Sequence, residues 1–224
     1  MKTLLIIDVQ NDFLPGGSLE VKDGDKIIDP INEIMDDYDY VIATKDWHPS
    51  DHVSFVDSHV GKKVGDIIKV NGINQILWPR HCIQDTFGAD FPNNLNHEKI
   101  NKTIYKGTNK DIDSYSGFYD NAKGATSHLS DYLKSKGIDK VDCVGLATEY
   151  CVKYTAIDAS KEGFSTRVKL KYTKGLNQND INQAIEEMRK VNNNLNTGNM
   201  ISQNIVKTGV ETKSTLANMT GSLV

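Results

Sequence analysis

The chain has 224 residues, of which 38% are hydrophobic, a composition that suits one buried core. Its 26 Lys and Arg residues against 30 Asp and Glu residues give a formal net charge of −4. Its basic residues are scattered rather than gathered into one stripe with aromatics, and no apolar run approaches membrane-spanning length, so we expect neither a nucleic-acid nor a membrane partner. The three cysteines are too few for a disulfide scaffold and the first apolar run is too short for a signal peptide, which predicts a cytoplasmic protein.

Short apolar runs alternate with helical patterns along the chain. Strand patterns occupy residues 3–7, 40–44, 103–105, 141–147 and 167–172, and helical patterns occupy residues 28–35, 127–135, 149–162 and 180–191. Gly137 and Gly163 each follow a helical pattern, where a C-terminal cap would lie, and Asn179 precedes one, where an N-cap would lie. This alternation is typical of an α/β protein with a parallel sheet.

Four chemically active side chains stand at or just after the ends of predicted strands: Asp8, Asp46, Lys106 and Cys151. In open parallel sheets, ligands bind beyond the carboxyl ends of the strands. We therefore expect these four side chains to meet in one crevice, although they come from distant parts of the sequence.

Cys151 stands where an apolar strand gives way to a helix. If Thr148 is the N-cap, Cys151 is at about the third helical position, where free N–H groups and the helix dipole favour a thiolate and could hold an oxyanion. The alternative is a buried cysteine that only packs the helix against the sheet. The other strand-end residues favour the first interpretation, a nucleophile.

Asp8 directly follows a buried strand, so partial desolvation can raise its pKa and make it a base for Cys151. The alternative for Asp8 is a turn or cap aspartate. Lys106 is a weaker candidate when taken alone, because most lysines are solvated surface residues. Only its place at the end of a strand singles it out.

A second group of residues has the chemistry of a metal site. Asp46 and His48 point to the same side of an extended segment, and His81 can complete a face of two imidazoles and one carboxylate. Three protein ligands leave coordination positions open, as in a reactive site. The alternative is a chance pair of loop histidines. We expect Cys82 to be a structural neighbour rather than a thiolate ligand, and His52 to be an outer or surface residue.

Several motifs, read together and in order over residues 2–190, closely resemble the nicotinamidases of the isochorismatase-like cysteine hydrolase superfamily. The motifs are Asp8-Val-Gln-Asn-Asp-Phe13, Asp46-Trp-His48-Pro49, Leu77-Trp-Pro-Arg-His81-Cys82, Lys106-Gly107, Tyr115-Ser-Gly-Phe118 and Gly145-Leu-Ala-Thr-Glu-Tyr-Cys151-Val152. The resemblance implies a Rossmann-like three-layer α/β/α fold with a mainly parallel sheet. It also implies a single hydrolase domain over residues 1–191 and a polar C-terminal extension over residues 192–224.

The resemblance assigns roles to particular residues. It implies a catalytic triad of Asp8, Lys106 and Cys151, and one divalent metal ion on Asp46, His48 and His81, with zinc expected ahead of iron or manganese. It also implies a cis peptide before Ala147, an oxyanion site made by the Ala147 and Cys151 amides, and a substrate pocket with aromatic walls. The residues that match those walls are Phe13, Trp78 and Tyr115.

The activity that the resemblance implies is hydrolysis of nicotinamide to nicotinate and ammonia through a cysteine thioester, in NAD salvage, with pyrazinamide as a second substrate. The nearest competing hypothesis is a related cysteine amidohydrolase that acts on N-carbamoyl or ureido substrates. An oxygenase with a two-His-one-carboxylate iron site is a third hypothesis, and it would not need Cys151. A fourth is a binding protein without activity. The sequence leaves open whether the chain forms a homo-oligomer.

Overall fold

Five parallel strands form the central sheet of the computed structural model, which describes residues 1–191. The predicted extension, residues 192–224, lies outside the described residues. The strands are β1 (Thr3–Ile7), β2 (Tyr40–Asp46), β5 (Lys102–Lys106), β6 (Lys140–Leu146) and β7 (Ser165–Lys174), and their order in the sheet is β5-β2-β1-β6-β7. The helices are α1 (Ile28–Ile34), α2 (Leu129–Ser135), α3 (Lys153–Lys161) and α4 (Gln178–Val191).

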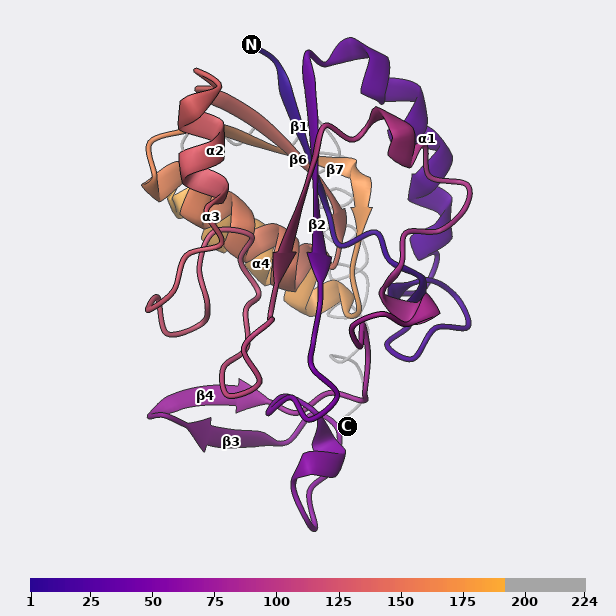
Figure 1. Ribbon diagram of the computed structural model, residues 1–224, viewed down its shortest axis with the longest axis vertical. Coiled ribbons are helices and arrows are strands. Elements are labelled where there is room, and N and C mark those ends of the chain that lie inside the picture. The colour runs from indigo at the N-terminus through magenta and orange to yellow at the C-terminus, as the bar shows by residue number, and fades with distance from the viewer. Residues whose placement is uncertain (192–224) are drawn as a thin grey trace, which may run out of the picture.

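The helices cover both faces of this sheet, so the predicted three-layer α/β/α architecture is confirmed (Figure 1). Strand β1 shows why, because every one of its side chains is buried, as expected for a strand with helices on both sides. Leu5 and Ile7 pack in one core with residues of α2, α3 and α4. Leu4 and Ile6 pack in a second core with residues of α1. Each fully buried Leu or Ile contributes about 1.5–3 kcal/mol of apolar burial.

Two predicted helix starts are wrong. The pattern over residues 149–162 divides into a single π turn, Thr148–Val152, followed by α3, and the N-cap position belongs to Ala147 with no side-chain cap. Helix α4 begins at Gln178, and Asn177 caps it, because its Oδ1 accepts the N–H groups of Asn179 and Asp180. The cap therefore lies two residues before the predicted one, at another asparagine in the same polar run.

The predicted helix ends at two glycines are confirmed. Gly137 and Gly163 have φ of 65° and 92°, the left-handed region that glycine adopts without strain. The N–H of the residue after each glycine donates to a carbonyl five residues back, as in the Schellman motif that closes many helices.

The long connection between β2 and β5 contains a two-stranded antiparallel hairpin, β3 (Ile67–Val70) and β4 (Ile73–Ile76), which the strand patterns did not predict. In Figure 1 this hairpin lies beyond the carboxyl ends of the parallel strands. A short parallel bridge between His48 and Ile83 fastens the end of the connection to the chain leaving β2. The connection thus covers the edge of the sheet where the predicted site lies. Within residues 1–191, no helix has the length and apolar character needed to cross a membrane.

Candidate active site

The four strand-end residues meet at the carboxyl edge of the sheet. Asp8 directly follows β1, Asp46 and Lys106 end β2 and β5 and are paired in register, and Cys151 lies in the π turn after β6. All four are buried. The side-chain ligand atoms of Asp8, Asp46 and Cys151 lie within 4.8 Å of one another. The parallel sheet therefore brings together the residues that the sequence placed at separate strand ends.

Lys106 is the centre of this group. Its Nζ lies 2.5 Å from Asp46 Oδ1 and 2.9 Å from Asp8 Oδ2, and it donates to the Cys151 Sγ at 3.4 Å. A further hydrogen bond runs from Nζ to the Ser114 carbonyl at 2.9 Å. The ammonium thus links two carboxylates, the thiol and a loop carbonyl, and these contacts fix the position of a side chain that is almost completely buried.

The protonation of the group follows from burial and from these contacts. Burial raises the pKa of Asp8, and Asp46 adds to that rise, while Lys106 and a hydrogen bond from Thr44 oppose it. Burial would lower the pKa of Lys106, but Asp46 and Asp8 raise it well above its ordinary value. Lys106 is therefore a permanent ammonium, and Asp8 is a carboxyl group that can hold a proton more readily than an exposed aspartate.

The pKa of Cys151 differs from the sequence expectation. Burial raises it well above the ordinary thiol value, and the opposing effect of the Lys106 charge is smaller. The predicted N-cap is also absent, so the nucleophile lies in a π turn rather than in the first turn of a capped α-helix. The resting group is accordingly a thiol, and a base must take its proton before it can attack.

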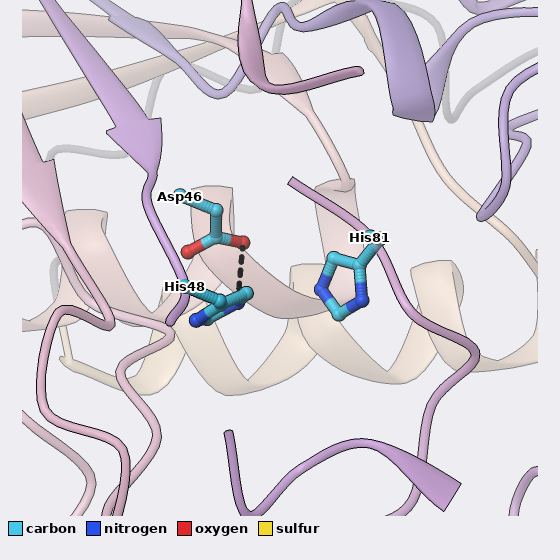
Figure 2. Close-up of side chains that lie close together, drawn as sticks. All are labelled: Asp46, His48 and His81. Carbon is cyan, nitrogen blue, oxygen red and sulfur yellow. Dashed lines mark ion pairs between the residues drawn. The ribbon is translucent and has the colours of Figure 1, made fainter. Parts of the chain in front are cut away.

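Asp46, His48 and His81 form a compact donor set in which one ligand atom from each lies within 4.8 Å of the others. Figure 2 shows Asp46 and His48 on the chain that leaves β2, and His81 facing them from another segment. His48 Nδ1 is 2.9 Å from the Gly107 carbonyl and His81 Nδ1 is 2.8 Å from the Pro79 carbonyl. These carbonyls hold a proton on each Nδ1, so each Nε2 presents a lone pair.

The charge state of this set suits a divalent cation. Burial, and then the neighbouring His81 and His52, lower the pKa of His48 well below its ordinary value, so His48 is a neutral imidazole at neutral pH. Metal ligation requires the neutral imidazole. Two imidazoles and one carboxylate are a donor set for zinc, iron or manganese. The residues present therefore fit a divalent metal ion.

Two neighbours of the donor set have the positions of supporting residues. His52 is fully buried rather than at the surface, and its ring stacks on that of His48 with centroids 4.1 Å apart. Cys82 is also fully buried, and burial raises the pKa of its thiol well above the ordinary value. The Cys82 carbonyl accepts the His48 N–H at 2.9 Å, so its backbone holds the segment that carries His48. These positions agree with an outer role for His52 and a structural role for Cys82.

A largely apolar pocket opens onto Cys151, Asp46 and His81. Phe13, Trp78 and Tyr115, the three predicted wall residues, all line it. Trp78 Nε1 donates to the Tyr115 hydroxyl at 3.1 Å, which joins two of the walls. The pocket is also lined by residues that the sequence did not single out as walls, namely Leu19, Val21, Asp113, Ala147, Tyr150 and Leu176.

The sequence indicates some of these additional lining residues better than others. Tyr150 precedes the predicted nucleophile, so its nearness to the pocket could have been expected from its position alone. Asp113 is buried with its carboxylate accepting from Gln75 and from the Ser114 N–H. Nothing in the sequence distinguishes it from the exposed Asp111 two residues earlier. Leu176 follows β7 in a loop, and no periodic pattern marks it.

The sequence matches the model of the Isochorismatase domain over residues 2–200. A curated nicotinamidase of Acinetobacter baylyi is 41% identical over 186 residues, which cover 83% of this chain and 87% of that protein. Among solved structures, an Acinetobacter baumanii nicotinamidase/pyrazinamidase superposes with a TM-score of 0.84 at 41% identity, covering 87% of this chain and 93% of that one. A Pyrococcus horikoshii pyrazinamidase in complex with zinc gives a TM-score of 0.69 at 37% identity, covering 85% of this chain and 95% of that one.

Proposed function

The chain belongs to the isochorismatase domain family, and from this premise we propose that it is a nicotinamidase, which hydrolyses nicotinamide to nicotinate and ammonia. The observation that carries the proposal is the buried cluster in which Lys106 contacts Asp8, Asp46 and Cys151, the last two of which line the aromatic pocket. Amide hydrolysis through a cysteine needs the thiol and a nearby group that accepts its proton, and this cluster supplies both beside a positive charge. The N-carbamoyl or ureido hypothesis is not favoured, because the curated relatives that the chain matches are nicotinamidases.

Cys151, Asp8 and Lys106 form the proposed catalytic triad. Asp8 accepts the Cys151 proton, and the Lys106 ammonium stabilises the thiolate as it forms. The thiolate attacks the carboxamide carbon, the carbonyl π electrons move to oxygen, and the C–N bond breaks as Asp8 returns its proton to the leaving ammonia. Asp8 then takes a proton from water, and the resulting hydroxide attacks the thioester carbonyl. The C–S bond breaks, Asp8 returns its proton to the Cys151 thiolate, and the acid leaves as nicotinate after it loses its own proton to water.

The backbone amides of Ala147 and Cys151 are the proposed donors to the oxyanion. Ala147 directly precedes the π turn and Cys151 lies within it, and the Leu146–Ala147 peptide before the turn is cis, as the resemblance implied. A well-placed backbone donor to an oxyanion contributes about 3 kcal/mol to transition-state stabilisation. The Tyr150 and Val152 amides both donate to the Ala147 carbonyl, at 3.1 and 3.2 Å, so the turn that carries these donors is held by its own hydrogen bonds.

Asp46, His48 and His81 are the proposed ligands of one divalent metal ion, with zinc ahead of iron or manganese; a zinc-bound relative supports this order. When bound, the ion supplies an open coordination position that a pyridine ring nitrogen can occupy and that can order water. Phe13, Trp78 and Tyr115 then enclose the ring by apolar contact. Pyrazinamide, with a ring of the same size, is the proposed second substrate.

The remaining parts of the proposal concern context. The three cysteines are unpaired, which supports a reducing cytoplasm, and nicotinate production places the activity in NAD salvage. Residues 1–191 form the proposed hydrolase domain, with residues 192–224 as a separate extension.

The test is ammonia release from nicotinamide and from benzamide, which has the same shape but lacks the ring nitrogen. We expect kcat/KM for nicotinamide to exceed that for benzamide by at least about tenfold, and His48→Ala to reduce the difference. His128→Ala is the matched control, because that side chain is 78% exposed and lies outside the pocket lining. Equal rates on the two amides would remove the role of the ring nitrogen, and absence of ammonia would remove the proposed activity.

A further inference from the structure

Glu149 is a buried carboxylate that the proposed mechanism does not use. It lies two residues before Cys151 in the π turn and is 3% exposed. Its Oε1 accepts the N–H groups of Leu176 and Asn177, at 2.7 and 2.9 Å. Its Oε2 is also buried and has no hydrogen-bond partner within residues 1–191. Burying a carboxylate is costly, so its contacts with the loop after β7 must offset that cost.

Gly175 shows how closely that loop approaches the carboxylate. A Cβ at Gly175 would lie 2.0 Å from Glu149 Oε2 and 2.8 Å from Ile181 Cγ1. Only a glycine permits this approach without displacing the loop or the carboxylate. The same loop starts α4, whose cap is Asn177. Glu149 therefore fastens the segment 175–177 to the turn that carries the nucleophile.

Leu176 is the residue of this segment that reaches the pocket, which it lines together with Phe13, Leu19 and Cys151. It is nevertheless 38% exposed, whereas Phe13 on the same pocket is buried. A leucine that faces both the pocket and solvent lies at the pocket's outer rim. Its position depends on the loop backbone, because the two Glu149 hydrogen bonds hold its own N–H and that of the next residue.

We propose that Glu149 is a positioning residue that holds Leu176 as the outer wall of the pocket, and that Leu176 thereby limits the substituents that the pyridine ring of the substrate can carry. The proposal rests on the proposed nicotinamidase function. It makes Glu149 act through Leu176 and not on the reacting atoms. The substrate class is accordingly pyridine carboxamides without bulk on the ring carbons that face this wall.

The first experiment is Leu176→Ala, with nicotinamide, 5-methylnicotinamide and 6-methylnicotinamide as substrates. We expect the kcat/KM ratio of at least one methylated amide to nicotinamide to rise about tenfold, because one methyl group in a close-fitting pocket changes discrimination by that order. Ile67→Ala is the control, an apolar residue in β3 that is 60% exposed and outside the pocket lining, and its ratios should equal those of the wild type. Unchanged ratios for both methylated amides would overturn the proposal. A wild type without ammonia release on any amide would instead refute the proposed function.

The second experiment separates positioning from general stability. The factor by which Glu149→Ala raises KM for nicotinamide should be about ten times the factor by which it lowers kcat. The variant should also shift the kcat/KM ratios of the methylated amides to nicotinamide, the methyl ratios, in the same direction as Leu176→Ala. Glu149→Gln keeps one acceptor oxygen and should stay within about threefold of the wild type in these ratios. In the double variant, Glu149→Ala should add no further change of selectivity to Leu176→Ala, because both act through one wall.

The role of Glu149 would be overturned if Glu149→Ala and Leu176→Ala had fully additive effects on selectivity. It would also be overturned if Glu149→Ala lowered kcat and left the methyl ratios unchanged. Gly175→Ala perturbs the same contact from the loop side and serves where Glu149→Ala does not fold. It should produce the same shift in the methyl ratios, and unchanged ratios in a folded Gly175→Ala variant would likewise contradict the proposal.

Discussion

Gly107→Ala should weaken metal binding by displacing the His48 ring, although it replaces none of the proposed ligand residues. Gly107 follows the last residue of β5, has φ of +64°, and its carbonyl accepts from His48 Nδ1 at 2.9 Å. A Cβ at this position would lie 2.3 Å from His48 Cε1 and 2.6 Å from Nδ1. The imidazole is buried and stacked on His52, so it has little room to retreat. The ring must shift, and its hydrogen bond to the Gly107 carbonyl is then strained or lost.

Two effects contribute to the expected magnitude. The left-handed backbone costs an alanine about 1–2 kcal/mol relative to glycine, and forcing a methyl group into a packed site costs a further 1–3 kcal/mol or so. Loss of an outer hydrogen bond to a metal-binding histidine typically weakens metal affinity about 10–100-fold. We therefore expect a zinc dissociation constant raised by about 10–100-fold, together with a lower free energy of unfolding.

Gly137→Ala is the matched control, because Gly137 has φ of +65° and the nearest atom to an added Cβ is Met1 Cε at 3.9 Å. It carries the same backbone strain without the clash. The assay is a zinc titration against a competing chelator on both variants, alongside urea unfolding. If Gly107→Ala binds zinc as tightly as Gly137→Ala, the Gly107 carbonyl does not orient His48 and the reasoning fails.

Three other predictions concern the nucleophile, acid stability and the extension. Cys151→Ala should lower kcat by roughly 10⁴-fold or more in the ammonia assay. Cys143→Ala, inside β6, should keep its activity and lower the free energy of unfolding by only about 1 kcal/mol. Comparable activity in the two variants would contradict the mechanism. Hydrogen bonds from Ser130, Tyr119 and Lys134 hold the pKa of Glu162 at about 2, below its ordinary 4.5, so its stabilising effect is present above pH 4.5 and is lost as pH falls towards 2. The difference in urea stability between wild type and Glu162→Gln should shrink over that range, and a difference independent of pH would refute the assignment. Truncation after Val191 should leave kcat for nicotinamide within about threefold of that of the full chain, because all the proposed site residues precede Val191. Loss of most activity in a folded truncated protein would assign the extension a role at the site.

The sequence by itself predicted the sheet and the convergence of the site, for reasons of periodicity and strand polarity. The run Leu4-Leu-Ile-Ile7 is apolar without alternation, which predicts a strand buried on both faces, and β1 is such a strand. Parallel strands share one carboxyl edge, so Asp8, Asp46 and Lys106 could be placed together from strand polarity alone. Helix starts were less predictable, because polar runs such as Asn177–Asp180 offer several residues that can cap.

Only the tertiary structure decided the properties that depend on desolvation and on how loops pack. The sequence predicted a helix-start position for Cys151, which would favour a thiolate, whereas in the structure burial raises the pKa of its thiol, and local sequence cannot reveal burial from all sides. The hairpin β3–β4, the stacking of His52 on His48, and the contact of Glu149 with the Leu176 loop join segments whose packing no local pattern marks. Such contacts leave no periodic signal, because each depends on the path of a loop over the finished sheet.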